Sequence, residues 1–160
     1  SNIASGGMIT KIKAAKIATA AGCNLIIAHG KNTNSLLELI NGGKHSIFKA
    51  NLSPLNAKKK WILSKRDKLK FVKIDNGAEK ALNLGKSLLA AGIKSNSNSF
   101  YRGEIVDILS NNDTFLGCGI IAYDSDEIEM IKGKKSTEIK KALGYKGRDE
   151  AIHRNDMVIN

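Results

Sequence analysis

The order of predicted elements in residues 8–48 limits the first part of this 160-residue chain to a piece of an α/β layer. Residues 8–21 contain Ala, Ile and Lys without Gly or Pro, which predicts a helix, and Gly22 follows where helices favour glycine. An apolar run at residues 25–28 is typical of a buried parallel strand, and a second strand begins near Ile47. Two strands cannot form a covered parallel sheet. We therefore expect most of this domain to lie upstream of residue 1 or to be missing.

The pattern changes near Leu69, where short strands replace the helix-rich order. Residues 71–74 alternate between apolar and polar, and residues 105–109 and 115–123 are further strand candidates separated by turn residues. Asn76-Gly77 predicts a turn. These features indicate a compact β-barrel of mixed type.

Helix signals in both parts of the chain begin at serines. Ser35 is expected to cap a helix over residues 36–40, and Ser125 a helix with acids in its first turn. The polar, basic residues 54–67 read as the end of the first domain and a linker. We therefore expect one domain over residues 1–66 and a second over residues 67–160.

The net positive charge of the chain comes from its first part. Residues 1–73 contain 14 Lys and Arg against two acids, whereas residues 74–160 contain 12 bases and 13 acids. A basic segment favours an anionic partner such as phosphate, nucleic acid or an acidic surface. The alternative is a set of solvated lysines that keep the chain soluble.

The remaining bulk features favour a cytoplasmic protein. No apolar run approaches the length of a membrane span, and the N-terminus has no apolar signal core, so we expect no membrane association. Cys23 and Cys118 have no metal or redox spacing and are expected to be buried small residues in a reducing compartment.

A glycine-containing segment before the first helix is the sharpest local motif. Glycines at a helix start allow backbone N–H groups to approach an anion, and the helix end adds partial positive charge. Lys11, Lys13 and Lys16 follow without a nearby acid, so their positive charges oppose the helix dipole. A bound phosphate would offset this repulsion. The alternative is an ordinary glycine turn with lysines on a solvated face. The segment consists of Ser5, Gly6, Gly7, Met8, Ile9, Thr10 and Lys11.

This segment, continued through residues 12–23, resembles the nucleotide loop and following helix of glutamate 5-kinases, with Ala4-Ser5 where that family has Gly-Thr. Lys59-Lys60-Trp61-Ile62 is similar to the end of the family's kinase domain. Later landmarks resemble its PUA domain in the right order: Asp75-Asn76-Gly77-Ala78, Gly85-Lys86-Ser87, Arg102-Gly103-Glu104, Tyr123-Asp124-Ser125, Leu143-Gly144-Tyr145 and His153-Arg154-Asn155. The resemblance implies part of the parallel sheet of an amino acid kinase, followed by a PUA-type β-barrel with short helices.

The resemblance also implies an activity. Members of this family transfer the γ-phosphoryl group of ATP to the side-chain carboxylate of glutamate, with Mg²⁺, at the start of proline biosynthesis. It implies that Lys11 is catalytic, that residues 5–11 hold the nucleotide, and that the complete enzyme is a homo-oligomer. The residues that grip glutamate would precede residue 1, so we expect this chain alone to be inactive.

Two other functional classes stay open at this stage. One is an RNA-binding PUA module, for which Tyr101 and Arg102 are a candidate stacking and phosphate pair. The near-neutral charge of residues 74–160 disfavours it, because RNA binding needs clustered Lys or Arg. The other is a regulatory remnant without kinase activity. His29 and His45 lack a metal-ligand pattern with Cys23 and are expected to have structural roles. His153 and Arg154 are candidate catalytic residues, but a structural role in a polar tail strand is favoured for them.

Overall fold

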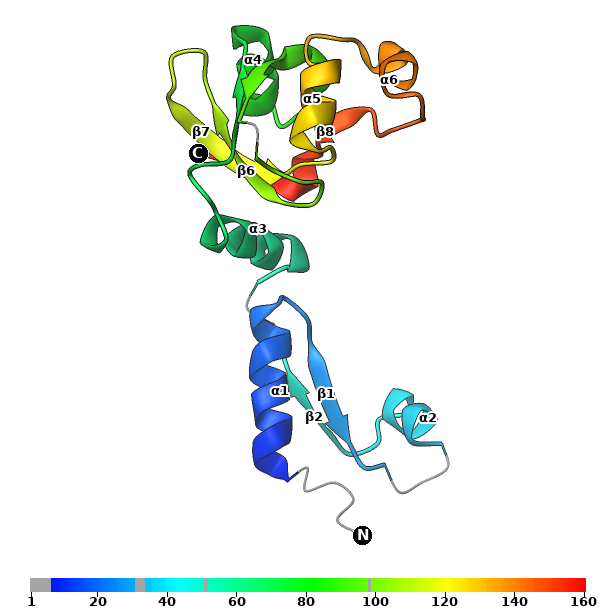
Figure 1. Cartoon of the computed structure of the whole chain (residues 1–160). Helices are drawn as coiled ribbons and strands as arrows, with labels where there is room; N and C mark the ends of the chain where they lie inside the picture. The colour runs from blue at the N-terminus through cyan, green and yellow to red at the C-terminus, as the bar shows by residue number, and fades with distance from the viewer. Residues whose placement is uncertain (1–6, 31–33, 51, 98) are drawn as a thin grey trace. The chain divides into compact units, whose positions relative to one another are not determined.

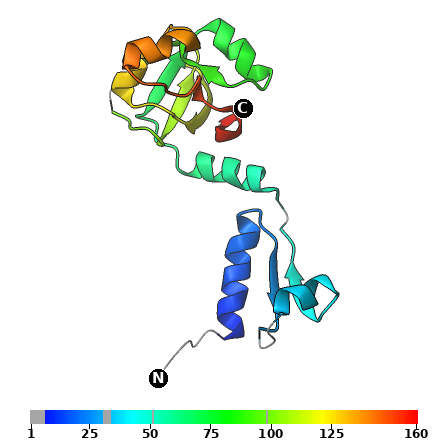
Figure 2. The same ribbon diagram turned by 90° about the vertical axis from the view of Figure 1, so that its right-hand side faces the viewer.

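The computed structural model describes residues 7–30, 34–50, 52–97 and 99–160, and the chain forms two compact units, residues 1–58 and 59–160 (Figures 1 and 2). Each unit is described by itself. The elements of the first unit are α1 (Met8–Ala20), β1 (Leu25–Ala28), α2 (Ser35–Ile40) and β2 (His45–Phe48). The helix α3 (Pro54–Ser64) begins in the first unit and continues into the second.

The first unit confirms the expected helix and its end at Gly22. This glycine has a φ of 80°, in the left-handed region that favours glycine. A Cβ at this position would lie 2.6 Å from the backbone nitrogen of Pro54, so the close approach also requires glycine. The structure places Asn34, not Ser35, at the N-cap of α2.

The two strands of the first unit pair antiparallel, which corrects the expectation of a parallel strand at residues 25–28. Leu25 lies opposite Phe48, and Ala28 lies opposite His45. The segment between the strands contains the six-residue α2 but returns the chain in the opposite direction, so it is no crossover. Alternate residues of β1 are exposed, as in a sheet that is covered on one face.

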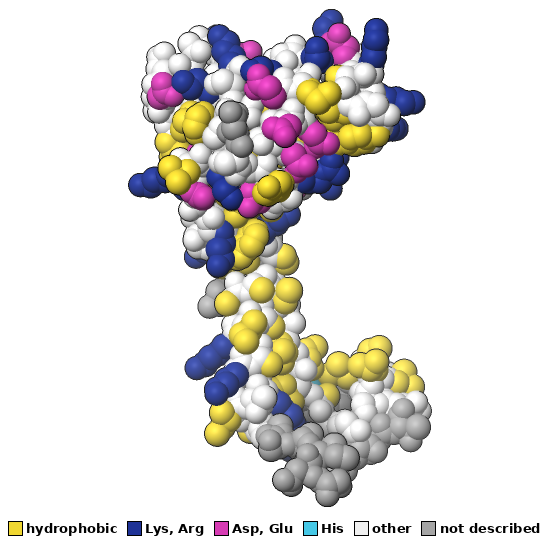
Figure 3. All heavy atoms as spheres, viewed as in Figure 1, with side chains coloured by type: hydrophobic (Ala, Val, Ile, Leu, Met, Phe, Trp, Pro, Cys, Tyr) yellow, Lys and Arg dark blue, Asp and Glu magenta, His cyan; other side chains and the backbone are white. Residues whose placement is uncertain are grey.

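The first unit has little core among its described residues. Ala15 is the one buried hydrophobic side chain there, and Cys23 is exposed, contrary to expectation. Figure 3 shows hydrophobic side chains at the surface of α1 and α2. Large exposed apolar residues of this unit include Met8, Ile9, Ile12, Ile17, Ile26, Leu36, Leu37, Ile40 and Ile47. This unit therefore leaves unburied the apolar surface that a complete α/β domain would cover.

The second unit is built on a mixed sheet with strand order β5-β3-β6-β7-β9. Strand β3 pairs parallel with β6, and the other neighbours in this sheet pair antiparallel. Strands β4 and β8 form a separate, short antiparallel sheet. The elements are β3 (Phe71–Ile74), α4 (Asn76–Asn83), β4 (Leu88–Leu89), the 3-10 helix η1 (Ala90–Gly92), β5 (Ile93–Asn96), β6 (Ile105–Leu109), β7 (Phe115–Ile120), α5 (Ser125–Ile131), α6 (Ser136–Leu143), β8 (Glu150–Ile152), η2 (Arg154–Asp156) and β9 (Met157–Ile159).

Asp75 and Asp124 begin the helices α4 and α5. The Asp75 carboxylate accepts a hydrogen bond from the Ala78 N–H at 2.7 Å, so Asn76 and Gly77 start α4 and do not form the expected turn. Asp124 precedes α5 as its N-cap, one residue before the expected Ser125. In both cases an aspartate occupies the N-cap, which the sequence analysis placed at Ser125 for α5 and did not place for α4.

The strand β6 is covered on both faces. Val106 and Ile108 are fully buried in the main core together with residues of α4, α5 and α6. Ile105 and Asp107 point to the opposite face, because side chains alternate along a strand. There Ile105 and Cys118 pack against Ile62 of α3, which is fully buried, so the burial expected for Cys118 is confirmed.

A charged pair fixes the chain just after α3 to the same face of β6. Arg66 Nε donates to Asp107 Oδ1 at 2.6 Å, and Nη2 donates to Oδ2 at 2.8 Å. The guanidinium carbon also lies 3.6 Å from the ring centroid of Phe115. Hydrogen bonding to Asp107 raises the pKa of Arg66. The segment that was expected to be a linker is thus a helix whose last turns dock on the sheet.

Among the described residues, none of the helices has the length and apolar character needed to cross a membrane.

Replacing Ile62 with Ala is expected to lower the free energy of unfolding of the second unit by about 2–5 kcal/mol, because it leaves a cavity under α3. Leu63 is the control, since it lies next in the same helix but is 43% exposed, and Leu63→Ala should cost less than about 1 kcal/mol. Urea unfolding of the 160-residue chain measures both. Equal losses for the two variants would show that α3 is not docked as described.

Candidate functional site

The start of α1 holds the described part of the predicted nucleotide segment. Ser5 and Gly6 lie outside the described residues, whereas Gly7 to Lys11 are described. Gly7 is the N-cap in an extended conformation, and its carbonyl accepts hydrogen bonds from the N–H groups of Thr10 at 3.1 Å and Lys11 at 3.4 Å. The first N–H groups of a helix have no acceptor within the helix, and Gly7 has no side chain to cap them.

The electrostatics of this helix end favour an anion. The first turn of α1 contains no acid, and Lys11 and Lys13 are exposed close to its start. Met8 and Ile9 are 60% and 72% exposed, so the first turn of α1 is not buried by the described residues. The arrangement suits a phosphate group, which would accept hydrogen bonds from the amides and pair with a lysine.

A metal site is not evident beside it. The described residues contain no group of three or more His, Cys, Asp and Glu side chains that could hold a metal ion. His45 Nδ1 lies 2.6 Å from the Gly43 carbonyl oxygen, and His153 Nδ1 accepts a hydrogen bond from the Asn155 N–H at 3.2 Å. These two histidines thus have the structural roles expected from the sequence.

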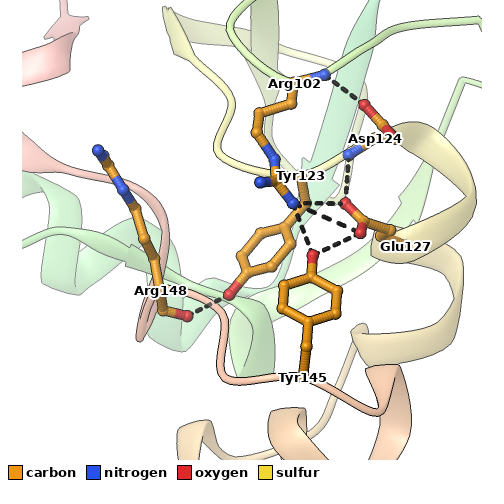
Figure 4. A network of polar contacts seen from close by, with 6 residues as sticks. All are labelled: Arg102, Tyr123, Asp124, Glu127, Tyr145 and Arg148. Atoms are coloured by element: carbon orange, nitrogen blue, oxygen red, sulfur yellow. Dashed lines mark hydrogen bonds and ion pairs between the residues drawn. The ribbon is translucent and has the colours of Figure 1, made fainter.

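A second polar constellation lies in the other unit and centres on Arg102 (Figure 4). Arg102 Nη2 lies 2.6 Å from the Tyr145 hydroxyl and 3.4 Å from Glu127 Oε2. The Tyr145 hydroxyl also lies 2.5 Å from Glu127 Oε1. Three elements therefore meet at one carboxylate: the turn before β6, the helix α5 and the loop after α6.

Backbone contacts fix this constellation in place. Glu127 Oε2 accepts a hydrogen bond from the Asp124 N–H at 2.9 Å, and Asp124 Oδ1 accepts one from the Arg102 N–H at 2.5 Å. The buried Tyr123 donates from its hydroxyl to the Arg148 carbonyl oxygen. A Cβ at Gly147 would lie 2.4 Å from this hydroxyl, so only glycine allows the loop to pass so close.

The protonation equilibria follow from these contacts. Burial opposes the charged form of Glu127, but hydrogen bonds from Tyr145, from the Asp124 backbone and from Arg102 together lower its pKa. Burial and the hydrogen bond to Glu127 raise the pKa of the Tyr145 hydroxyl. The carboxylate is thus charged and the phenol neutral at neutral pH.

A pocket of about 460 Å³ adjoins this network, lined among others by Arg102, Tyr123, Tyr145, Lys146 and Arg148. Arg102 is engaged by Glu127 and Tyr145, while Tyr101 is 74% exposed with its N–H bonded to Glu104. The structure therefore does not join Tyr101 and Arg102 into a stacking and phosphate pair, and it favours the structural role for Arg102.

Sequence reasoning missed the partners that hold these side chains. The pairs Arg66–Asp107 and Glu127–Tyr145 join residues that are 41 and 18 positions apart. One signal was present for the first pair: Asp107 interrupts an apolar strand, and an acid buried there requires a cation. Nothing in the local sequence indicates which cation it is.

Replacing Glu127 with Gln should lower the free energy of unfolding by about 1–3 kcal/mol at pH 7, because Arg102 and Tyr145 lose a charged partner. The folded-state pKa of Glu127 lies below its unfolded value of about 4.3, so its contribution is present above that value and is lost as the pH falls through the folded-state pKa. The difference in the free energy of unfolding between Glu127→Gln and the wild type should therefore diminish below about pH 4.

The matched control is Glu129→Gln, because Glu129 lies on the same helix but its side chain is 55% exposed in a surface pair with Lys132. Urea unfolding at a series of pH values gives both differences. A Glu127→Gln difference that stays constant down to pH 3 would argue against the described network.

Comparison with known proteins finds relatives over nearly the whole chain and a family match within the second unit. The PUA domain family matches residues 70–143. Glutamate 5-kinases of Rhizobium johnstonii and Agrobacterium fabrum are each 44% identical to the chain over 159 residues, which is 99% of this chain and 41% of each relative. The enzyme of Bartonella henselae is also 44% identical over 159 residues. The chain spans about two fifths of the length of the curated relatives that it matches.

Solved structures similar to the chain include a conserved PUA domain protein from Thermoplasma acidophilum, with a TM-score of 0.39 and 24% identity, covering 70% of this chain and 64% of that protein. A PUA domain from Aeropyrum pernix K1 has a TM-score of 0.41 and 18% identity, and covers 82% of this chain and 85% of that chain.

The fold class expected from the sequence, an α/β fragment followed by a PUA-type β-barrel with short helices, is thus confirmed, although the two strands of the first unit pair antiparallel and not parallel. Over 99% of its length the chain is thus similar to part of the glutamate 5-kinases, and within that length residues 70–143 match the PUA domain family.

Proposed function

We propose that this chain is part of an ATP-dependent glutamate 5-kinase that phosphorylates the glutamate side-chain carboxylate, the first step of proline biosynthesis. The observation that carries the proposal is 44% identity to glutamate 5-kinases over 99% of the chain. Ser5 to Lys11 form the nucleotide-binding segment in this proposal, and Lys11 is its catalytic residue.

The chemistry of this step needs positioning and charge neutralisation more than covalent participation by the protein. When bound, ATP supplies the γ-phosphoryl group that the glutamate carboxylate accepts. The amides at the start of α1 bind phosphate oxygens, and Lys11 Nζ stabilises the negative charge that shifts toward the leaving group. No acid in the first turn competes for these donors.

Mg²⁺ belongs to the proposal as a companion of ATP. The described residues provide no cluster of acids for it. We propose that the ATP phosphates and residues preceding this chain supply its ligands. This matches the usual binding of Mg²⁺ by substrate phosphates with one or two carboxylates.

The complete enzyme is proposed to be a cytoplasmic homo-oligomer whose glutamate site lies in the part that this chain lacks. The exposed apolar side chains of α1 and α2 support this proposal, because a complete nucleotide-binding domain would bury them. We place the kinase domain near residues 1–66 and the PUA domain near residues 67–160, with the last turns of α3 packed on the PUA sheet.

The alternative functions are an RNA-binding PUA module and a regulatory remnant without kinase activity. The engagement of Arg102 by Glu127 and Tyr145 weighs against the first, because that guanidinium is the cation placed beside Tyr101. The presence of Lys11 near the start of α1, with no acid in its first turn, weighs against the second.

The purified 160-residue chain is expected to form no glutamyl phosphate from ATP, Mg²⁺ and glutamate, since the glutamate site and most of the sheet precede it. A coupled assay for ADP release measures this. Turnover that Lys11→Ala abolishes would contradict the proposal.

Lys11→Ala in the complete enzyme is expected to lower kcat by two to four orders of magnitude, about 3–5 kcal/mol, with a smaller rise in KM for ATP. The reason is that a charge aligned with the transition state contributes more there than in the ground state. Steady-state kinetics on a protein with its N-terminal part restored measures both constants.

Lys13→Ala is the matched control, because Lys13 lies on the same helix and is exposed. Its effect should be slight. Near-normal turnover by a Lys11→Ala enzyme that melts at the wild-type temperature would identify Lys11 as surface charge.

A further inference from the structure

Three cations of the second unit converge on one pocket. The pocket measures about 300 Å³ and is lined by Lys59, Lys86 and Arg154, with Leu82, Met157 and Ile159 among its apolar residues. No acid is among its lining residues. Like charges gathered at one pocket repel one another, and a bound anion offsets that cost.

The backbone fixes Lys86 at the edge of this pocket. Helix α4 ends in a Schellman arrangement, in which Gly85 N–H bonds the Leu82 carbonyl at 2.8 Å and Lys86 N–H bonds the Ala81 carbonyl at 3.1 Å. Gly85 has a φ of 74°, which the turn requires and which favours glycine. These contacts therefore fix the direction of the backbone at Lys86.

Arg154 is tied to the same place. Ser87 Oγ accepts a hydrogen bond from the Arg154 N–H at 3.1 Å, which joins residues 67 positions apart. The pairing of Leu88 with Ile152 continues this contact into the β4–β8 ladder. The backbone segments that carry Lys86 and Arg154 are thus held close together by a hydrogen bond and a strand pairing in which the charged groups take no part.

Lys59 comes from the docked helix. It lies one turn before Ile62, and side chains three residues apart share a helix face. Because Ile62 is fully buried against β6 and β7, Lys59 is directed toward the sheet and is itself half-buried. The third cation is therefore positioned by the packing of α3.

These three side chains have no partner in the described part of the chain, whereas other cations of the unit do. Lys70 pairs with Glu104 at 2.8 Å and Lys73 pairs with Asp113 at 2.6 Å. Among the described residues, the charged groups of Lys59, Lys86 and Arg154 form no ion pair and no hydrogen bond. Their donors are available to an external ligand.

We propose that this pocket binds a small phosphate-bearing anion, such as a phosphate or diphosphate group. The arginine fork matches phosphate geometry, and the two lysines add charge from other sides. The volume lies at the lower limit of ligand pockets, which suits a phosphate group better than a whole nucleotide. The apolar side chains beneath it strengthen the charge interactions by lowering the local dielectric.

The test is a titration of the ¹⁵N-labelled chain with sodium pyrophosphate, with NaCl adjusted to keep the ionic strength constant. Saturable shifts are expected at the amides of Lys86, Ser87 and Asn155. Lys86→Gln and Arg154→Gln should each weaken binding about tenfold, and the double variant should abolish it. Lys80→Ala is the control, because Lys80 lies on α4 but does not line the pocket. A dispersed spectrum verifies that each variant is folded.

The same titration on the Lys11→Ala chain separates this site from the start of α1, since the shifts at Lys86 and Ser87 should persist. Absence of saturable shifts, or equal affinity in the double variant, would overturn the proposal. A short single-stranded RNA that bound the pocket more tightly than pyrophosphate would also overturn it, because the site would then recognise nucleic acid.

Discussion

The covering of β6 on both faces is the constraint on which the second unit depends. Val106 and Ile108 face the main core, while Ile105 and Asp107 face the other way and would meet water without α3. A carboxylate there is tolerated because Arg66 satisfies both of its oxygens and stacks on Phe115. Docking of α3 therefore needs a cation beside Asp107, and Arg66 supplies it. The same docking directs Lys59 to the basic pocket.

The two units differ in how far their own residues complete them. The second has a continuous core of strands and helices, and its polar side chains around Arg102 and Glu127 are mutually satisfied. The described part of the first has one buried hydrophobic side chain and many exposed ones. The relatives extend well beyond the matched segment, since it covers 41% of their length. We attribute the incompleteness of the first unit to this missing part.

Sequence patterns predicted what local chemistry determines. The helix from Met8 and the strands at residues 71–74 and 105–109 follow from periodicity and turn residues, and Gly22 ends α1 as expected. The strand expected over residues 115–123 is present but ends at Ile120. Patterns failed where a distant partner decides the structure. Ile62 and Arg66 read as linker residues because their partners on β6 and β7 lie about 40 or more positions away. Strand direction at β1 was wrong because an apolar run carries no information about its neighbour.

The exact N-cap residue of a helix is also difficult to predict from the sequence. Asp75 and Asp124 each lie next to another good capping residue, and the choice between neighbours depends on the entry direction of the chain. For the candidate site, the assignment of Gly7 and Lys11 rests on the resemblance to glutamate 5-kinases and stays a proposal. The basic pocket escaped notice because Lys59, Lys86 and Arg154 come from three separated segments.

Residue-resolved amide hydrogen exchange on the intact 160-residue chain tests the central claim most directly, which is that the second unit is a complete folding unit and the first is a partial domain. The account predicts slow exchange in β3, β6 and β7, approaching the free energy of global unfolding, and fast exchange in α1, β1 and β2, whose apolar side chains lack cover. Exchange in α1 and β1 as slow as in β6 would contradict the account, because the first unit would then be stable without the missing part.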